Sequence, residues 1–202
     1  MTDPRPHADV PGMKLPTPRT PDPASAPGLR WGLLGAGWIA EQMTIALQGT
    51  SQQVVAVGSR DLGRAQAFVA AHAPGARAHG DYASLVADDE VDVVYVASPH
   101  SEHLEHALLA IGAGKHVLVE KPIAPTAAEA AQIAAAASEA GVYCMEAMWT
   151  RFLPHIDVLR QVLDAGLLGE VSTVLADHSI QLWPDGPERL ADPDLAGGAM
   201  LD

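Results

Sequence analysis

The chain has 202 residues, enough for one large domain or for one domain and part of a second, and 48% of them are hydrophobic. Its net charge of −13 excludes general nucleic-acid binding, which needs a basic surface, and argues against adhesion to anionic membranes. Because only 4% of the residues are aromatic, we expect a core of Ala, Val, Leu and Ile side chains.

The cellular compartment can be predicted from cysteine usage and from apolar runs. Cys144 is the single cysteine, so no disulfide can form within the chain, and we interpret it as a core residue rather than a nucleophile. No signal-peptide pattern opens the sequence, and no apolar run is long enough to span a bilayer. We therefore expect a cytoplasmic protein with no membrane partner.

Alternating strand and helix patterns begin after a proline-rich segment. Residues 1–29 hold eight of the 16 prolines and show no hydrophobic periodicity, which predicts a disordered tail. Strands are expected at 30–34, 53–58, 92–97, 116–119 and 142–145, and helices at 38–48, 61–72, 81–87, 101–113, 126–140 and 151–165. This alternation predicts an α/β fold with a doubly wound parallel sheet of the Rossmann type.

A glycine-rich turn joins the first predicted strand to the first predicted helix. Gly35 allows a tight turn off the strand, and Gly37 lets the backbone approach a pyrophosphate. Ala40 is small enough for helix and strand to pack closely, and the N–H groups at the helix start can hold phosphates. Such turns are common after strands, so the alternative is a turn that only packs the helix on the sheet.

The second predicted strand ends at Ser59 and Arg60, at about the spacing from the glycine turn where a ribose is read. An NAD site favours an acidic residue here, whereas a hydroxyl and a guanidinium suit a 2′-phosphate. Asp61 follows directly, and we interpret it as the cap of the next helix. The pattern favours NADP over NAD, and the alternative for Arg60 is a solvated loop charge.

Histidines recur every three residues after the strand predicted at 92–97. Ser98, Pro99 and His100 stand at its carboxyl end, where parallel sheets bind ligands, and His100 could contact a nicotinamide ribose. His103 and His106 follow at a spacing that rotates around a helix, and no carboxylate cluster completes a metal site. We therefore expect no metal, and interpret the three side chains as helix-start caps and solvent-facing imidazoles.

The tripeptide Glu120-Lys121-Pro122 follows the strand predicted at 116–119. A lysine at the carboxyl end of a strand can point its cation into the ligand crevice, bind a substrate hydroxyl and stabilise a developing alkoxide during hydride transfer. The alternative is a surface lysine before a turn. Spacing alone does not choose between the two.

A further strand is expected over 171–180, because an apolar stretch follows a helix that already completes the first unit. It looks like the opening strand of another sheet. The sequence then runs through Pro, Asp and Gly residues at 184–194 and ends at Asp202 without a capping signal.

Three motifs, in this order along the chain, resemble those of the Gfo/Idh/MocA oxidoreductases. They are Gly-Ala-Gly-Trp-Ile-Ala at 35–40, Ser-Pro-His at 98–100 and Glu-Lys-Pro at 120–122. The segments 145–154 and 196–202 resemble the branch that contains dihydrobenzenediol and NADP-dependent xylose dehydrogenases. The resemblance covers about residues 30–202.

The resemblance implies a domain organisation and a set of site residues. It implies an NAD(P)-binding Rossmann domain over 30–150, followed over 151–202 by the incomplete start of an α+β substrate and dimerisation domain. Lys121 then takes a catalytic role beside the nicotinamide, Trp149 lines the substrate pocket, and Asp202 opens an Asp-x-Gly-x-Tyr (or His) motif. The cofactor would contact Gly35, Ala36, Gly37, Trp38, Ile39, Ser59, Arg60, Ser98, Pro99, His100, Glu120 and Lys121.

The implied activity is that of an NADP-dependent dehydrogenase, which moves hydride between nicotinamide and a sugar or cyclic-diol hydroxyl. The Tyr or His of the last motif would lie beyond Asp202, so we expect an N-terminal portion that binds cofactor better than it turns over. A homodimer is implied for a chain with a complete second domain. The alternative is a non-catalytic NADP-binding protein or redox sensor, while a methyltransferase is disfavoured because Arg60 stands where an acidic residue is wanted.

Overall fold

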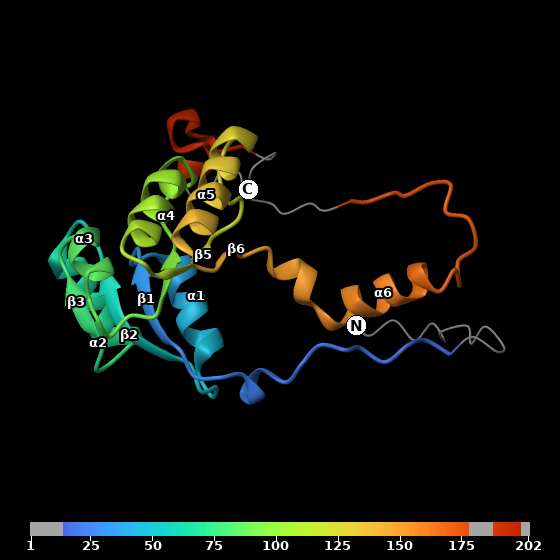
Figure 1. Cartoon of the computed structure of the whole chain (residues 1–202), viewed down its shortest axis with the longest axis horizontal. Coiled ribbons are helices and arrows are strands. Elements are labelled where there is room, and N and C mark those ends of the chain that lie inside the picture. Colours follow the sequence, from blue (N-terminus) through green and yellow to red (C-terminus); the bar gives the residue numbers. More distant parts are fainter. Residues whose placement is uncertain (1–13, 178–187, 199–202) are drawn as a thin grey trace. The chain divides into compact units, whose positions relative to one another are not determined.

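The computed structural model describes residues 14–177 and 188–198, which contain a six-stranded parallel sheet (Figure 1). The strands are β1 (Arg30–Leu34), β2 (Gln53–Gly58), β3 (Arg77–His79), β4 (Val93–Val96), β5 (His116–Val119) and β6 (Cys144–Glu146), in the order β3-β2-β1-β4-β5-β6. The strand order reverses between β1 and β4, and ligands bind at such a switch point in doubly wound sheets. This architecture confirms the predicted fold class.

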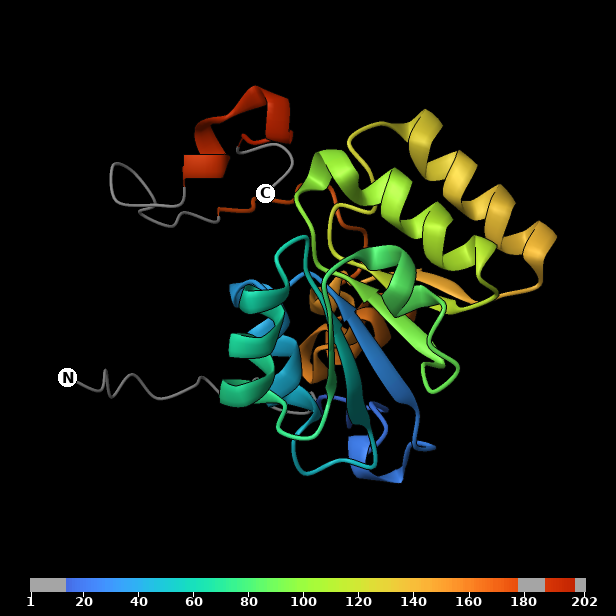
Figure 2. The ribbon, with the colours of Figure 1, turned by 90° about the vertical axis from the view of Figure 1, so that its left-hand side faces the viewer.

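Helices cover both faces of the sheet. The α-helices are α1 (Trp38–Leu47), α2 (Leu62–His72), α3 (Tyr82–Val86), α4 (His103–Gly112), α5 (Ala127–Ala140) and α6 (Pro154–Asp164). Short 3-10 helices are Pro23–Ser25, His100–Glu102, Trp149–Phe152, Glu188–Ala191 and Pro193–Leu195. Figure 2 shows α1 and α2 on one face of the sheet and α3, α4 and α5 on the other. None of the described helices combines the length and the apolar character needed to cross a membrane.

The core follows from the alternation of side chains along the strands. Leu33 and Val57 pack with Phe68 of α2 on one face, whereas Leu34 and Val94 belong to the cluster under α4 and α5. Successive strand residues point to opposite faces, so neighbours such as Leu33 and Leu34 serve both layers. Both leucines are fully buried.

Two compact units divide the chain, and each is described by itself. The larger is Asp22–Met148 with Ile180–Asp202, and the smaller is Met1–Pro21 with Trp149–Ser179. In the smaller unit the guanidinium of Arg19 pairs with Asp157 of α6, with Nη2 2.7 Å from Oδ1.

Most predicted elements have bounds within three residues of those observed, and two differences matter. β3 was not predicted, because Arg77–His79 is a short strand with a single apolar residue. The strand predicted over 171–180 is wrong for 171–177, which form no strand and leave Leu175 93% exposed. No described strand pairs with this stretch, and residues 178–180 lie outside the described range.

Residues 22–29, which we expected to be disordered, are held by specific contacts. Asp22 caps the 3-10 helix Pro23–Ser25 by accepting from a backbone N–H. Nε2 of Gln52 donates to the carbonyl oxygen of Pro27 at 2.7 Å. The proline-rich segment directly before β1 is therefore held in place by these hydrogen bonds.

Candidate functional site

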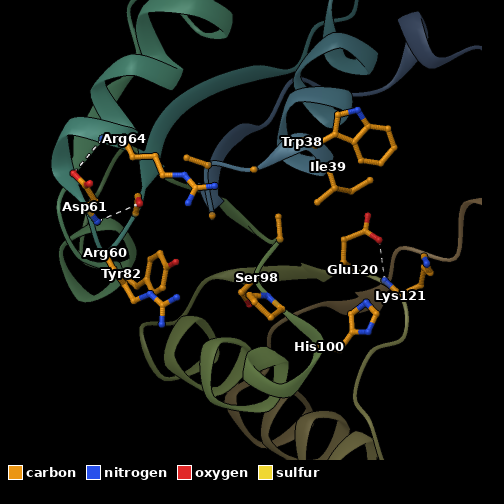
Figure 3. Close-up of a pocket in the computed structure, with 16 residues that line it drawn as sticks. Trp38, Ile39, Arg60, Asp61, Arg64, Tyr82, Ser98, His100, Glu120 and Lys121 are labelled. Carbon is orange, nitrogen blue, oxygen red and sulfur yellow. Dashed lines mark hydrogen bonds between the residues drawn. The ribbon is translucent and has the colours of Figure 1, made fainter. Parts of the chain in front are cut away.

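A pocket of about 660 Å³ opens at the carboxyl edge of the sheet, within the larger unit (Figure 3). The turn after β1 and the residues that follow β2, β4 and β5 line it, with contributions from the starts of α2 and α3. The lining residues are Gly35, Ala36, Gly37, Trp38, Ile39, Ser59, Arg60, Asp61, Arg64, Tyr82, Ala97, Ser98, Pro99, His100, Glu120 and Lys121. All twelve residues predicted to contact a cofactor are among them, so the structure brings together motifs that lie far apart in sequence.

Different constraints act on the two glycines of the turn, Gly35 and Gly37. Gly35 has φ +116°, and a Cβ there would lie 2.8 Å from the carbonyl oxygen of Ala97, so the fold itself requires glycine. A Cβ on Gly37 would meet no atom of the described chain within 4 Å. Packing does not account for Gly37, whereas a ligand lying against its backbone would.

The start of α1 presents backbone N–H donors at this pocket. Gly37 is the N-cap and offers no side chain to cap the helix. The first N–H groups of a helix have no intrahelical acceptor, and the helix dipole makes this end positive. Trp38 and Ile39 occupy the first helical turn and line the pocket, and the Trp38 side chain is 71% exposed. This end of α1 is suited to a phosphate group.

The residues after β2 place positive charge at one end of the pocket. Asp61 accepts from the N–H groups of Gly63 and Arg64, which confirms its interpretation as a helix cap. The Arg60 side chain is 72% exposed, and its Nη1 donates to Oε1 of Glu102 at 3.0 Å. Arg60 is therefore ion-paired and not simply a solvated loop charge. Figure 3 shows Arg60 and Arg64 on the same side of the pocket as Tyr82.

Arg64 and Tyr82 also line the pocket, although neither was predicted as a site residue. Arg64 lies three residues after the helix cap, so one turn of α2 brings it to the pocket. Its only signal in the sequence is its place in the first turn of the helix that follows Asp61. Tyr82 opens α3, and burial raises the pKa of its hydroxyl.

The histidines are buried, so the prediction of solvent-facing imidazoles is wrong. His103 is fully buried, with Nδ1 2.8 Å from the carbonyl oxygen of Pro122 and Nε2 3.0 Å from that of Ser98. Burial lowers the pKa of His103, and a neutral ring can donate to only one of the two carbonyls at a time. The start of α4 turns these side chains towards the loops after β4 and β5, where backbone carbonyls need donors.

The two other histidines, His100 and His106, are also buried and also lie near polar groups. His106 Nδ1 is 2.8 Å from Oγ of Ser98, and its ring makes an edge contact with Tyr82. His100 is 6% exposed and lines the pocket, with Nδ1 3.4 Å from the carbonyl oxygen of Ala196. Within residues 14–177 and 188–198, no group of three or more His, Cys, Asp and Glu side chains could hold a metal.

Glu120 and Lys121 lie at the other end of the pocket from Arg60 (Figure 3). The buried hydroxyl of Tyr95 donates to one oxygen of Glu120, and the backbone N–H of Lys121 donates to the other at 3.0 Å. Burial, reinforced by the charge of Glu120, raises the pKa of Tyr95, so its hydroxyl stays protonated as a donor. Lys121 lines the pocket, as a ligand-facing lysine would.

Among the described residues, Trp149 is the one predicted site residue that does not line this pocket. Trp149 begins the 3-10 helix Trp149–Phe152 of the smaller unit, and its side chain is 61% exposed. Asp202 lies outside the described residues. Cys144 is half-buried in β6, and burial raises the pKa of its thiol, which disfavours a nucleophilic role.

Comparison with known proteins gives consistent matches. The Gfo/Idh/MocA family model, described as an oxidoreductase family with an NAD-binding Rossmann fold, matches residues 29–148. The chain is 41% identical over 178 residues to trans-1,2-dihydrobenzene-1,2-diol dehydrogenase of Mus musculus, covering 86% of this chain and 52% of that protein. It is 38% identical over 194 residues to D-xylose 1-dehydrogenase (NADP(+)) of Hypocrea jecorina, covering 86% and 50%.

A solved structure extends the likeness to three dimensions. A point mutant of KijD10, a 3-ketoreductase from Actinomadura kijaniata in complex with TDP-benzene and NADP, superposes with a TM-score of 0.78 at 34% identity. The match covers 87% of this chain and 54% of that one. The chain thus spans about half the length of the curated relatives that it matches.

Proposed function

The chain belongs to the Gfo/Idh/MocA oxidoreductase family, and we propose that its pocket binds a nicotinamide dinucleotide, with NADP preferred over NAD. One observation carries this proposal. A single pocket at the switch point of the sheet joins the glycine turn, the arginines after β2 and the Glu120-Lys121 pair. Dinucleotides lie across this crevice in doubly wound sheets.

The residues present fit such a cofactor. The open space over Gly37 leaves room for a pyrophosphate against the backbone, and the start of α1, which has no side-chain cap, offers N–H donors to it. The adenosine ribose would then lie towards the end of β2, and the nicotinamide towards Glu120 and Lys121. A pocket of about 660 Å³ is in the range of small-molecule sites.

The preference for NADP rests on the charges after β2. Arg60 and Arg64 both line the pocket there, and guanidinium groups bind phosphate oxygens well. The carboxylate of Asp61 is engaged by the N–H groups of its own helix, so it is not placed to receive a ribose diol. The names of two relatives, the xylose dehydrogenase and KijD10, also include NADP.

The proposed reaction moves hydride between nicotinamide and a hydroxyl carbon of a sugar or cyclic diol. The bound cofactor supplies the hydride acceptor or donor. Lys121 places an ammonium at the nicotinamide end, where it would hydrogen-bond the substrate oxygen and stabilise developing negative charge. Glu120 is held by Tyr95 and by the Lys121 backbone, and so fixes the loop that carries this lysine. Within that reaction Lys121 is the proposed catalytic residue.

The part of the chain that follows β6 would bind the substrate. We assign Trp149 to the substrate pocket, and residues 151–202 to the start of a substrate domain that would also mediate a homodimer. Asp202 would open the motif that carries the remaining acid–base residue. These assignments follow the family resemblance and not the described pocket.

A titration with both cofactors tests the proposal. Nicotinamide fluorescence should show that the chain binds NADPH more tightly than NADH. The proposal would be contradicted if the chain bound neither cofactor. Turnover should then be sought with a panel of aldoses and cyclic diols. The K121M variant should keep NADPH binding and lose any turnover. Binding without turnover by the unchanged chain would favour the non-catalytic alternative.

A further inference from the structure

Glu102 forms an ion pair with Arg60, one of the residues that line the pocket. It ends the 3-10 helix His100–Glu102, and its Oε1 accepts from Nη1 of Arg60 at 3.0 Å. The Glu102 side chain is 23% exposed, against 72% for Arg60, so the carboxylate is the fixed partner of the pair. Glu102 is not itself among the pocket-lining residues. Any effect that it has on a ligand therefore passes through the Arg60 guanidinium.

Within the described chain, the second carboxylate oxygen of Glu102 lacks the hydrogen bond that a buried acceptor normally has. Oε2 is buried and has no hydrogen-bond partner among the described residues. His106 is a possible cationic partner for this oxygen, with its Nδ1 3.9 Å away. Burial lowers the pKa of His106, and its Nδ1 already lies 2.8 Å from Oγ of Ser98. A buried oxygen without a partner costs stability, so fold stability alone does not explain a glutamate here.

We propose that Glu102 is a positioning residue that sets cofactor selectivity by competing with the 2′-phosphate of NADP for the Arg60 guanidinium. This inference rests on the proposed function, because it takes the pocket to be a dinucleotide site. A carboxylate paired with Arg60 neutralises part of the positive charge that a phosphate dianion needs. The uncharged 2′-hydroxyl of NAD is much less sensitive to this charge. Glu102 thus reduces the NADP preference that Arg60 and Arg64 create.

The matched variants are E102Q and E105Q, tested in the full chain. E102Q removes the charge but keeps the size and an oxygen acceptor for Arg60. Glu105 is exposed in the first turn of α4, so E105Q removes an equal charge nearby without touching the arginine. A third variant, E102D, keeps the negative charge. Thermal unfolding of each variant shows that it folds, and dissociation constants for NADPH and NADH are measured by fluorescence titration.

The expected result is a change in the ratio of the two affinities. E102Q should bind NADPH about three- to tenfold more tightly, as expected for one charge removed at several ångströms, and should leave NADH within about twofold. E105Q and E102D should keep the ratio of the unchanged chain. In an R60A background, E102Q should shift NADPH affinity by less than about twofold, because the guanidinium that it neutralises is absent.

The outcomes separate this inference from the proposed function. If the unchanged chain binds neither dinucleotide, the proposed function fails and this inference fails with it. If the chain binds NADPH but E102Q weakens that binding, or moves NADPH and NADH affinities equally, Glu102 is a structural residue and only this inference is overturned.

Discussion

The buried hydroxyl of Tyr95 donates a hydrogen bond to the carboxylate of Glu120. The bond joins β4 to the residue that follows β5, and the same carboxylate also accepts from the backbone N–H of Lys121. The orientation of the proposed catalytic loop is thereby tied to the core of the sheet. Tyr95 is 2% exposed, so Glu120 receives this hydrogen bond from a side chain of the buried core.

The Y95F variant should therefore lose stability. Removing the hydroxyl takes the buried donor away from one oxygen of the half-buried Glu120 carboxylate, and losing such a donor typically costs about 1–3 kcal/mol. Urea unfolding measures the loss. Y143F is the matched control, because Tyr143 is 68% exposed, and its free energy of unfolding should change by less than about 0.5 kcal/mol. Equal stability of Y95F and Y143F would show that the Tyr95 bond contributes nothing.

The G35A variant should be destabilised for two reasons. The residue has φ +116°, and the new Cβ would lie 2.8 Å from a backbone carbonyl oxygen that cannot move freely. Strained backbone alone costs about 1–3 kcal/mol. G75A separates the two causes, because Gly75 has φ +100° with nothing near its Cβ. Denaturant unfolding should show a larger loss for G35A than for G75A, and the reverse order would contradict the close approach to Ala97.

The arginines after β2 should distinguish the two cofactors. R60A and R64A should each weaken NADPH binding by about tenfold or more, because each removes a charged donor to the 2′-phosphate, and should change NADH binding by less than about twofold. Titrations at two salt concentrations measure this, with R77A as the control, since Arg77 pairs with Asp88 away from the pocket. Equal losses for NADPH and NADH would show that these arginines do not read the 2′-phosphate.

His103 should make stability fall in mild acid. Burial lowers its folded-state pKa below the unfolded value of about 6.5, so below that pH the unfolded chain binds a proton that the folded chain resists. Stability from the neutral ring is thus present at pH 7 and declines as the pH falls through 6.5. In the H103N variant, which keeps a donor near the Nδ1 position, the free energy of unfolding should fall less between pH 7 and 5. Parallel profiles for the two proteins would contradict this.

Most of the strands and helices, and twelve of the residues that line the pocket, could be predicted because their signals are local. Apolar runs such as 116–119 mark buried strands, and Asp61 marks a helix start. The cofactor-facing residues follow directly from strand ends, which parallel sheets gather at one edge. β3 could not be predicted, since Arg77–His79 has no apolar run and depends on pairing with β2.

Contacts made by the tertiary fold could not be predicted in this way. The spacing of the histidines suggested exposure, yet His103 satisfies carbonyls on two loops that are distant in sequence. Arg64 lines the pocket from the first turn of α2, and its contact with the pocket depends on how that helix packs on the sheet. The strand expected over 171–180 shows the converse, because the apolar pattern of its described part, 171–177, forms no strand where no described strand pairs with it.

The G37V variant is the most direct test of whether a dinucleotide binds at the glycine turn. Gly37 has φ −106°, which any residue adopts, and its Cβ would meet nothing in the described chain, so the folded state should tolerate valine. The same side chain would fill the space over the backbone where a pyrophosphate would lie. We predict a midpoint of thermal unfolding within a few degrees of the unchanged chain, together with loss of NADPH and NADH binding in fluorescence titration. A stable G37V protein that binds NADPH with unchanged affinity would contradict the cofactor site.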